Sequence, residues 1–264
     1  MTTSLLPWRR PRLNVIVLHG IIAARPGFLN ADAMRPVIEK AFASARRRPI
    51  ILDIESPGGS PVQSDVIAQM IRTHADHAGV RVHAVIREVG ASGGYWLACA
   101  GDEIHANPMS IVGSIGVIGG GFGFPGLLHR IGVERRLYTA GRNKARLDPF
   151  SPEKPEDVAF AKDLMDKLHA RFVVWVKSRR GNRLKAPDEE LFDGGYMLGE
   201  QAMTLGLIDA FSTVDELVRQ LGGDRARARR FAPKRPRLPF RLPRLLVDAA
   251  LDALEDRSWP MRLR

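Results

Sequence analysis

The sequence predicts an α/β fold in which helices flank a mainly parallel β-sheet. Short apolar runs rich in valine and isoleucine alternate along the chain with longer amphipathic segments, and three glycine-rich turns each follow a predicted strand. Parallel strands that are buried on both faces have continuous hydrophobic sequences, and a helix usually connects one to the next. Strands that alternate with helical segments therefore indicate a parallel sheet covered by helices.

The predicted strands are short and apolar. The first, at 14–18, is a continuous β-branched run, which is typical of a buried strand. The other predicted strands cover 49–54, 80–86, 103–106, 115–118 and 134–139.

The predicted helices have apolar residues three or four positions apart. This spacing is clear at 31–47 and at 156–179, and Gly181 is expected to end the second of these. The segment 92–100 is apolar nearly all round, which predicts a buried helix. Further helices are expected at 62–75, 127–131, 199–205 and 214–221.

The charge distribution divides the chain into three parts. The whole sequence has a net charge of +11, and residues 224–264 carry +7 of it, from 12 Lys/Arg and 5 Asp/Glu. The Arg/Pro-rich stretch 225–243 is expected to form no packed core, because proline breaks helices and sheets. A short amphipathic helix is expected at 245–255. We therefore expect a basic leader at 1–12, a main domain at 13–223 and a basic tail at 224–264.

The sequence favours a cytoplasmic location. The only cysteine, Cys99, lies in an apolar run and is expected to be a core residue. The leader has no apolar core of the kind that signal peptides have, and the apolar run 13–24 is too short to span a bilayer. The basic tail leaves two interpretations open: a solvated terminus, or peripheral contact with an anionic partner at the inner membrane face. Nucleic acid is a less favoured partner, because few aromatic residues and no recognition motif accompany the charge.

The three glycine-rich turns hold the candidate nucleophiles. Ser92, in the turn 90–94, precedes the predicted buried helix, so it is either a nucleophile near a helix N-terminus or simply an N-cap. Ser114, in the turn 113–116, precedes an extended segment and is interpreted as a turn or wall residue. The turn 56–59 has two adjacent glycines, whose backbone N–H groups could approach a ligand or only form a tight turn.

A serine nucleophile needs a base. None of the seven histidines lies in a glycine-rich turn. His19 closes the first strand and could reach a site at the end of the sheet, while the others fit exposed or interhelical positions. His74 and His77 have helical spacing, but no carboxylate motif accompanies them, so we expect no metal and no cofactor. Lys144 is the other candidate, because a lysine can act as a base when burial and nearby positive charge disfavour its protonation. If the segment around it is extended, Arg142 and Arg146 project on its side and supply that charge; the alternative is an exposed basic loop.

Six motifs in order resemble the signal peptide peptidase (protease IV) family of Ser-Lys serine peptidases, over about residues 13–212. The motifs are Ser-Pro-Gly-Gly at 56–59, Ala-Ser-Gly-Gly-Tyr-Trp at 91–96, Ala-Gly-Asp-Glu-Ile-His-Ala at 100–106, Gly-Ser-Ile-Gly-Val at 113–117, Gly-x-x-Lys at 141–144, and Asp-Gly with Gly-Glu-Gln-Ala and Gly-Leu-Ile-Asp within 193–209.

The resemblance implies a Clp-protease/crotonase-like fold, self-association into a ring-like homo-oligomer and a catalytic dyad. Ser92 would be the nucleophile and Lys144 the base, from the same or a neighbouring subunit. The backbone N–H groups of Gly59 and Gly93 would bind the oxyanion. Residues implied to line the substrate groove are Ser56, Gly58, Ser114 and Ile115.

The implied substrates are unfolded or hydrophobic peptides, such as remnants of signal peptides, bound as extended strands. Two alternatives stay open. A crotonase-type acyl-CoA enzyme would share the fold, although no acidic residue lies at the glycine turns. A non-catalytic ring scaffold would use the assembly and the basic tail.

Overall fold

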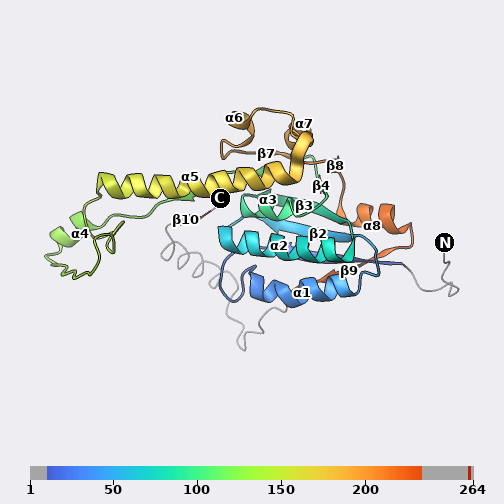
Figure 1. Ribbon diagram of the computed structural model, residues 1–264, viewed down its shortest axis with the longest axis horizontal. Helices are drawn as coiled ribbons and strands as arrows, with labels where there is room; N and C mark the ends of the chain where they lie inside the picture. Colours follow the sequence, from blue (N-terminus) through green and yellow to red (C-terminus); the bar gives the residue numbers. More distant parts are fainter. Residues whose placement is uncertain (1–10, 234–260, 263–264) are drawn as a thin grey trace. The chain divides into compact units, whose positions relative to one another are not determined.

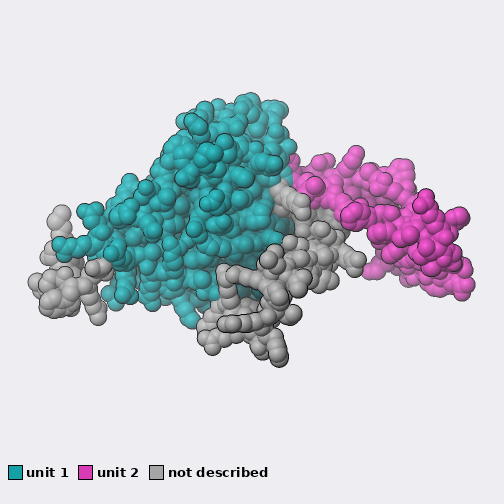
Figure 2. Space-filling model, turned by 180° about the vertical axis from the view of Figure 1, so that it is seen from behind, with its two compact units in different colours: residues 1–116, 171–240, 263–264 teal, residues 117–170, 241–262 magenta. Residues whose placement is uncertain are grey.

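The computed structural model describes residues 11–233 and 261–262. The chain forms two compact units, shown in different colours in Figure 2. Unit 1 comprises residues 1–116, 171–240 and 263–264, and unit 2 comprises 117–170 and 241–262. The expected helix at 245–255 lies outside the described residues, and so does most of the basic tail.

Unit 1 contains an eight-stranded sheet that is parallel at every pairing except the one between β5 and β7. The main order is β7-β5-β3-β2-β1-β9, and β4 pairs with β3 and β8 off this path. The strands are β1 (Arg12–His19), β2 (Ile50–Ser56), β3 (Val82–Ala91), β4 (Glu103–Ala106), β5 (Ile111–Gly113), β7 (Tyr196–Leu198), β8 (Ala210–Phe211) and β9 (Arg227–Phe231). The predicted α/β class with a mainly parallel sheet is confirmed.

Helices cover both faces of this sheet (Figure 1). Asn14 of β1 donates a hydrogen bond to Ala41 O of α1 at 2.7 Å, whereas its neighbours Leu13 and Val15 pack with Leu217 of α8. Successive residues of a strand point to opposite faces, so α1 and α8 cover different faces. The helices of unit 1 include α1 (Ala31–Ala43), α2 (Pro61–Ala78), α3 (Gly93–Ala98), α6 (Asp188–Leu191), α7 (Gly199–Thr204) and α8 (Val214–Gly222), with a 3-10 turn at Gly181–Arg183.

The long helix α5 (Pro155–Arg180) begins in unit 2, and its last turns belong to unit 1. There, Phe172 and Trp175 pack on Trp96 of α3 with ring-centroid distances of 4.9 and 6.0 Å. Trp175 Nε1 also donates a hydrogen bond to Trp96 O at 3.0 Å. Together with the packing of α3 against α2, β2 and β3, these contacts bury all six residues of α3, as its apolar sequence predicts.

Unit 2 contains the short helix α4 (Pro125–Arg130), the first turns of α5, and an antiparallel pair of β6 (Ile118–Gly119) and β10 (Met261–Arg262). No residue from 117 to 156 is buried, and the structure describes all of them. Many of these residues are large and apolar, including Phe122, Leu127, Leu137 and Tyr138. This stretch therefore exposes apolar surface within the single chain.

Three expectations for individual elements were wrong. The expected strand at 134–139 is irregular and exposed. The expected strand at 115–118 is also absent: β5 ends before it, and only its last residue, Ile118, belongs to a strand, β6. The stretch 225–243 was expected to form no packed core because proline breaks sheets, but Arg227–Phe231 forms β9, which pairs with β1 from Arg12↔Arg227 to Ile16↔Phe231. Residues 234–243 lie outside the described residues. Within the described ranges, no helix is long and apolar enough to cross a bilayer.

Candidate active site

Ser92 lies between β3 and α3 with a backbone conformation of φ 53° and ψ −121°. Its N–H donates a hydrogen bond to Gly113 O at 2.8 Å, and its carbonyl accepts one from Trp96 N at 2.9 Å. The side chain makes no capping hydrogen bond, so Ser92 occupies the N-cap position of α3 without capping the helix through its hydroxyl. A non-glycine residue with positive φ at a strand-to-helix turn is typical of a nucleophile elbow.

The hydroxyl of Ser92 is buried without a hydrogen-bond partner among the described residues. The residue has 0% of its surface exposed. An unpaired buried hydroxyl costs free energy, about 1–3 kcal/mol. The site therefore keeps a polar group in a strained, desolvated position, which is a feature of catalytic residues.

The Ser-Pro-Gly-Gly turn approaches Ser92 closely. A Cβ at Gly58 would lie 2.8 Å from Ser92 Cβ and 2.8 Å from Gly93 N, and the φ of Gly58 is +104°. A residue with a side chain would therefore clash here and adopt an unfavourable backbone conformation. The sequence alone could not distinguish this close approach from an ordinary tight turn.

The two expected oxyanion donors flank this contact. Gly93 is the first residue of α3, and the first N–H groups of a helix have no partner within the helix. Gly59 is held in place because Ile22 N donates to Gly58 O at 2.8 Å and Ser60 N donates to Ile22 O at 2.7 Å. Neither of these hydrogen bonds uses the N–H of Gly59.

The third glycine-rich turn supports the backbone of Ser92 through Gly113 O. Ser114 is nearly buried, with a φ of 52°, and its N–H donates to Gly195 O at 2.6 Å. Ile115 is also buried. Ser56, at the end of β2, is fully buried, and its hydroxyl accepts a hydrogen bond from Gly58 N at 3.2 Å. The assignment of these residues to a substrate groove stays a prediction.

Lys144 lies in unit 2, whereas Ser92 lies in unit 1, so their pairing stays a prediction. Within the single chain, Lys144 is exposed and its N–H donates to Gly141 O at 3.1 Å. Residues 142–147 form turns, so the extended conformation assumed for this segment is wrong. Arg146 lies 3.4 Å from Asp157 and stacks over the Phe160 ring.

A second polar cluster surrounds Asp53, which the sequence did not reveal. His19 Nε2 lies 3.2 Å from Asp53 Oδ1, and Arg230 of β9 binds the other carboxylate oxygen. Burial acts to raise the pKa of Asp53, but the interactions with His19 and Arg230 outweigh it and lower the pKa. Asp53, Arg87 and Arg230 line a cavity of about 360 Å³. His19, the histidine expected to reach a sheet-end site, thus contacts a buried carboxylate.

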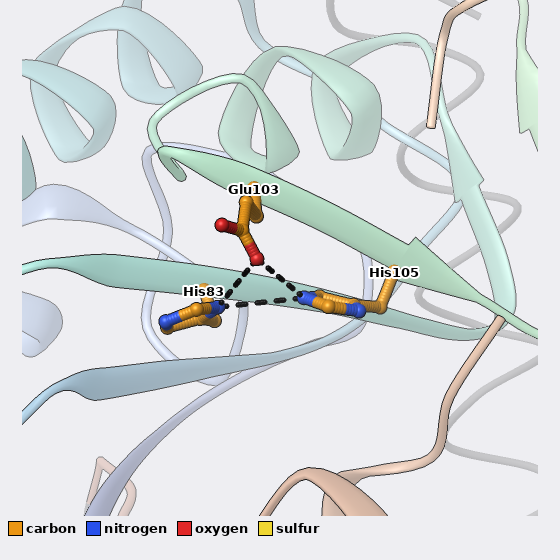
Figure 3. A group of neighbouring side chains, drawn as sticks. All are labelled: His83, Glu103 and His105. Carbon is orange, nitrogen blue, oxygen red and sulfur yellow. Dashed lines mark hydrogen bonds and ion pairs between the residues drawn. The ribbon is translucent and has the colours of Figure 1, made fainter. Parts of the chain in front are cut away.

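Two histidines do not occupy the exposed or interhelical positions expected for them. His83 and His105 are each 5% exposed, and both lie in the sheet beside Glu103 (Figure 3). By contrast, His74 stacks on Phe42 with a ring-centroid distance of 5.6 Å. The sequence missed the His83–Glu103–His105 cluster because its members are about 20 positions apart and only the pairing of β3 with β4 brings them together.

Comparison with known proteins places the chain in a family of peptidases. The family model described as Peptidase family S49 matches residues 74–226, which include Ser92 and Lys144. A Brucella abortus protein named "Na(+)/H(+) antiporter NhaA" is 43% identical over 238 residues, which are 90% of this chain and 32% of that protein.

Two further relatives carry protease names. A Synechocystis sp. protein named "Putative protease slr0021" is 30% identical over 78% of this chain and 72% of its own length. A Haemophilus influenzae protein named "Probable protease SohB" is 28% identical over 64% of this chain and 47% of its own length. The chain thus spans about a third of the Brucella relative and a larger share of the other two.

Proposed function

The chain belongs to peptidase family S49, and from this premise we propose that it is a serine endopeptidase with Ser92 as its nucleophile. The observation that carries the proposal is the conformation of Ser92. Its hydroxyl is buried and unpartnered among the described residues, on a strained turn that leads into a helix. Such a turn supports a nucleophile, because it presents a hydroxyl next to backbone N–H groups.

The proposed reaction is acyl transfer to Ser92. The hydroxyl oxygen attacks the peptide carbonyl carbon while a base removes its proton, and the carbonyl oxygen becomes an oxyanion. The N–H groups of Gly93 and Gly59 stabilise this oxyanion. The tetrahedral intermediate then expels the amine, which receives the proton from the base, and water hydrolyses the acyl-enzyme by the same steps.

We propose Lys144 as this base, supplied by the same chain or by a second copy. A lysine is a base only when uncharged, and burial favours the uncharged form. Lys144 is exposed within the single chain, so the proposal requires that assembly or substrate covers it.

Self-association into a ring-like homo-oligomer is part of this proposal. The support is the stretch 117–156, which contains no buried residue and exposes many large apolar side chains. Contiguous apolar surface on a soluble protein usually marks an interaction site. A Clp-protease/crotonase-like architecture would be consistent with such an assembly.

We propose that the substrates are unfolded or hydrophobic peptides. β7 is an edge strand of the described sheet and pairs with β5. Ile111 of β5, with Tyr196 and Leu198 of β7, exposes apolar surface at this edge. An edge strand can bind an extended peptide through main-chain hydrogen bonds, while apolar side chains select apolar residues of the peptide.

Hydrolysis of casein and of a fluorogenic apolar peptide tests the proposal. Ser92→Ala and Lys144→Ala are each expected to lower the turnover rate by about 10⁴-fold or more. The matched control is Lys154→Ala, which replaces another exposed lysine of unit 2 and should retain activity. Ser114→Ala replaces the rival serine and should retain far more activity than Ser92→Ala. Thermal unfolding checks that every variant folds.

The assignment of Ser92 as nucleophile and the assignment of Lys144 as base can each be rejected without the other. An active Ser92→Ala protein, combined with an inactive but folded Ser114→Ala protein, would move the nucleophile to Ser114. An active Lys144→Ala protein beside an inactive Ser92→Ala protein would keep the peptidase but reject the base.

A further inference from the structure

The side chains of His83, Glu103 and His105 converge on one point of the sheet (Figure 3). We propose that these three side chains bind a divalent metal ion of the borderline class, with Zn²⁺ as the best fit. The site is separate from the peptidase site proposed above.

Strand register places the three side chains on one face of the sheet. In the parallel pairing of β3 with β4, His83 lies opposite Glu103 and Val85 lies opposite His105. Residues two apart on a strand point to the same face. Val85 packs with Leu217 and Val218 of α8, so the cluster lies on the face of the sheet that α8 covers.

The distances within the cluster fit metal ligands better than hydrogen bonds. His83 Nδ1 lies 3.3 Å from Glu103 Oε2 and 3.4 Å from His105 Nε2, and these last two atoms are 3.7 Å apart. Hydrogen bonds from N–H groups are usually about 2.7–3.2 Å long. Atoms bound tetrahedrally about 2.0–2.1 Å from Zn²⁺ lie about 3.3–3.4 Å from each other. The cluster therefore needs only a small contraction to coordinate the ion.

The donor atoms are available in the forms that a metal needs. Burial is the main cause that lowers the pKa of His83 and the pKa of His105, and this direction favours the neutral imidazole that a metal binds. Glu103 Oε1 is held by Arg81 Nη2 at 2.7 Å, which leaves Oε2 directed at the two imidazoles. An outer partner that fixes a carboxylate in this way is common around metal sites.

The composition and exposure of the cluster define the class of ion. Imidazole nitrogens suit Zn²⁺, Co²⁺ and Ni²⁺, whereas Mg²⁺ and Ca²⁺ prefer oxygen ligands. The histidine side chains are each 6% exposed, while the Glu103 side chain is 36% exposed. An ion can thus enter from the side of the carboxylate, and a water molecule can complete the tetrahedron.

The expected role of the ion is to stabilise the sheet. It would join the first half of β3 to β4, whose pairing spans only His83↔Glu103 to Ile86↔Ala106. Ser92 follows the other end of β3, nine residues and roughly 30 Å along the strand from His83. The ion would therefore take no part in peptide cleavage.

Binding of Zn²⁺ and Co²⁺ to the chelator-stripped full-length protein tests the site. Zn²⁺ is expected to raise the unfolding temperature increasingly with its concentration, and Co²⁺ is expected to give the visible absorption of a tetrahedral complex. Glu103→Gln keeps the shape of the side chain and should weaken the affinity at least about tenfold. His105→Asn should abolish the Co²⁺ spectrum. Peptide hydrolysis should be unchanged by chelation at temperatures where the protein stays folded.

The matched control is His77→Asn, which removes an exposed histidine of α2. It should leave the Zn²⁺-dependent rise in unfolding temperature and the Co²⁺ absorption unchanged. If Zn²⁺ gives no stabilisation of the wild type, or if Glu103→Gln and His105→Asn bind as tightly as the wild type, the site does not exist. Loss of binding in His77→Asn would assign the ion to the protein surface. None of these outcomes depends on whether Ser92 cleaves peptides.

Discussion

At the scale of single residues, the backbone around Ser92 combines strain with close packing. Ser92 has a φ of 53°, and the neighbouring Gly58 has a φ of +104° with no room for a Cβ. Strained residues persist only when the surrounding structure holds them in place. Here the hydrogen bond from Ser92 N to Gly113 O and the contact with Gly58 do so.

Gly58→Ala is expected to abolish peptide cleavage by moving Ser92. The matched control is Gly20→Ala, because Gly20 has almost the same φ, +101°, but an added Cβ would meet nothing within 4 Å. Each substitution is expected to lower the free energy of unfolding by about 1–2 kcal/mol through backbone strain. Urea unfolding measures this loss. Only Gly58→Ala also adds a clash with Ser92 and Gly93. Equal activity of the two variants would show that the contact with Ser92 is unimportant.

The identity of the candidate nucleophile was predictable from sequence, but its geometry was not. Ser92 lies between a predicted strand and a predicted buried helix, and both elements are present. Whether its side chain caps the helix depends on φ and ψ, which the residue types around it do not determine. For the same reason, the burial of His83 and His105 emerged only with the register of β3 and β4.

At the scale of elements, a buried ion pair fixes the end of α5 to the segment after α7. Arg180 donates hydrogen bonds to both oxygens of Asp209, at 2.7 and 2.9 Å, and to Gly206 O. Ile104 N donates to Asp209 Oδ2 at 2.7 Å, so β4 joins the same cluster. The Arg180 side chain is 1% exposed, and loss of its partner would leave a buried unpaired charge.

Asp209→Asn is expected to lower the free energy of unfolding by about 3–5 kcal/mol near neutral pH. Burial acts to raise the pKa of Asp209, but hydrogen bonds from Arg180 and from Ile104 N outweigh it, so the pKa lies below the ordinary value. The stabilisation is therefore fully present above the unfolded-state pKa of about 3.9 and is lost as the pH falls through the lower folded-state pKa.

Urea unfolding between pH 7 and pH 3 measures the loss of stability at neutral pH and the dependence of stability on pH. The range extends to pH 3 because the ordinary carboxyl pKa is about 3.9. The variant should be less stable at neutral pH and should lose less stability than the wild type on acidification. Asp163→Asn is the control, because it breaks an exposed ion pair with Lys167 and should change stability by less than about 1 kcal/mol. An unchanged acid dependence in Asp209→Asn would contradict the assigned pKa.

Elements with a strong apolar pattern were predicted well, and elements fixed by their neighbours were not. The segment 156–179 had a clear helical pattern and forms most of α5. β9 was missed because arginine and proline dominate its surroundings, although Ala226, just before it, is buried with Leu13 and Leu217. The segment 134–139 was expected to be a strand but is exposed and irregular, and no described strand pairs with it.

At the scale of the whole molecule, the predicted class follows from the alternation of strands and helices. The division into two units was not predicted, because α5 runs continuously through the boundary between them. The apolar surface of residues 117–156 is also a property of the folded chain. A list of hydrophobic residues does not show which of them remain uncovered.

Replacing Phe122 and Tyr138 with aspartate is expected to prevent self-association. These side chains are 74% and 89% exposed, so the substitutions cost little stability in a single chain but place charge in the proposed interface. Size-exclusion chromatography with light scattering measures the mass. Val62→Asp, which changes an exposed apolar residue of unit 1, should leave the mass unchanged. A wild-type protein that is monomeric at all concentrations would contradict the prediction.

The hydrogen bonds that fix the Ser92 turn come from far along the chain. Ser92 N donates a hydrogen bond to Gly113 O. Ser114, which follows Gly113, donates one through its own N–H to Gly195 O. During synthesis, Ser92 leaves the ribosome about a hundred residues before Gly195 does, so the hydrogen bonds that fix its turn are incomplete on the nascent chain. A peptidase that uses Ser92 as proposed would therefore become active only after the domain is complete.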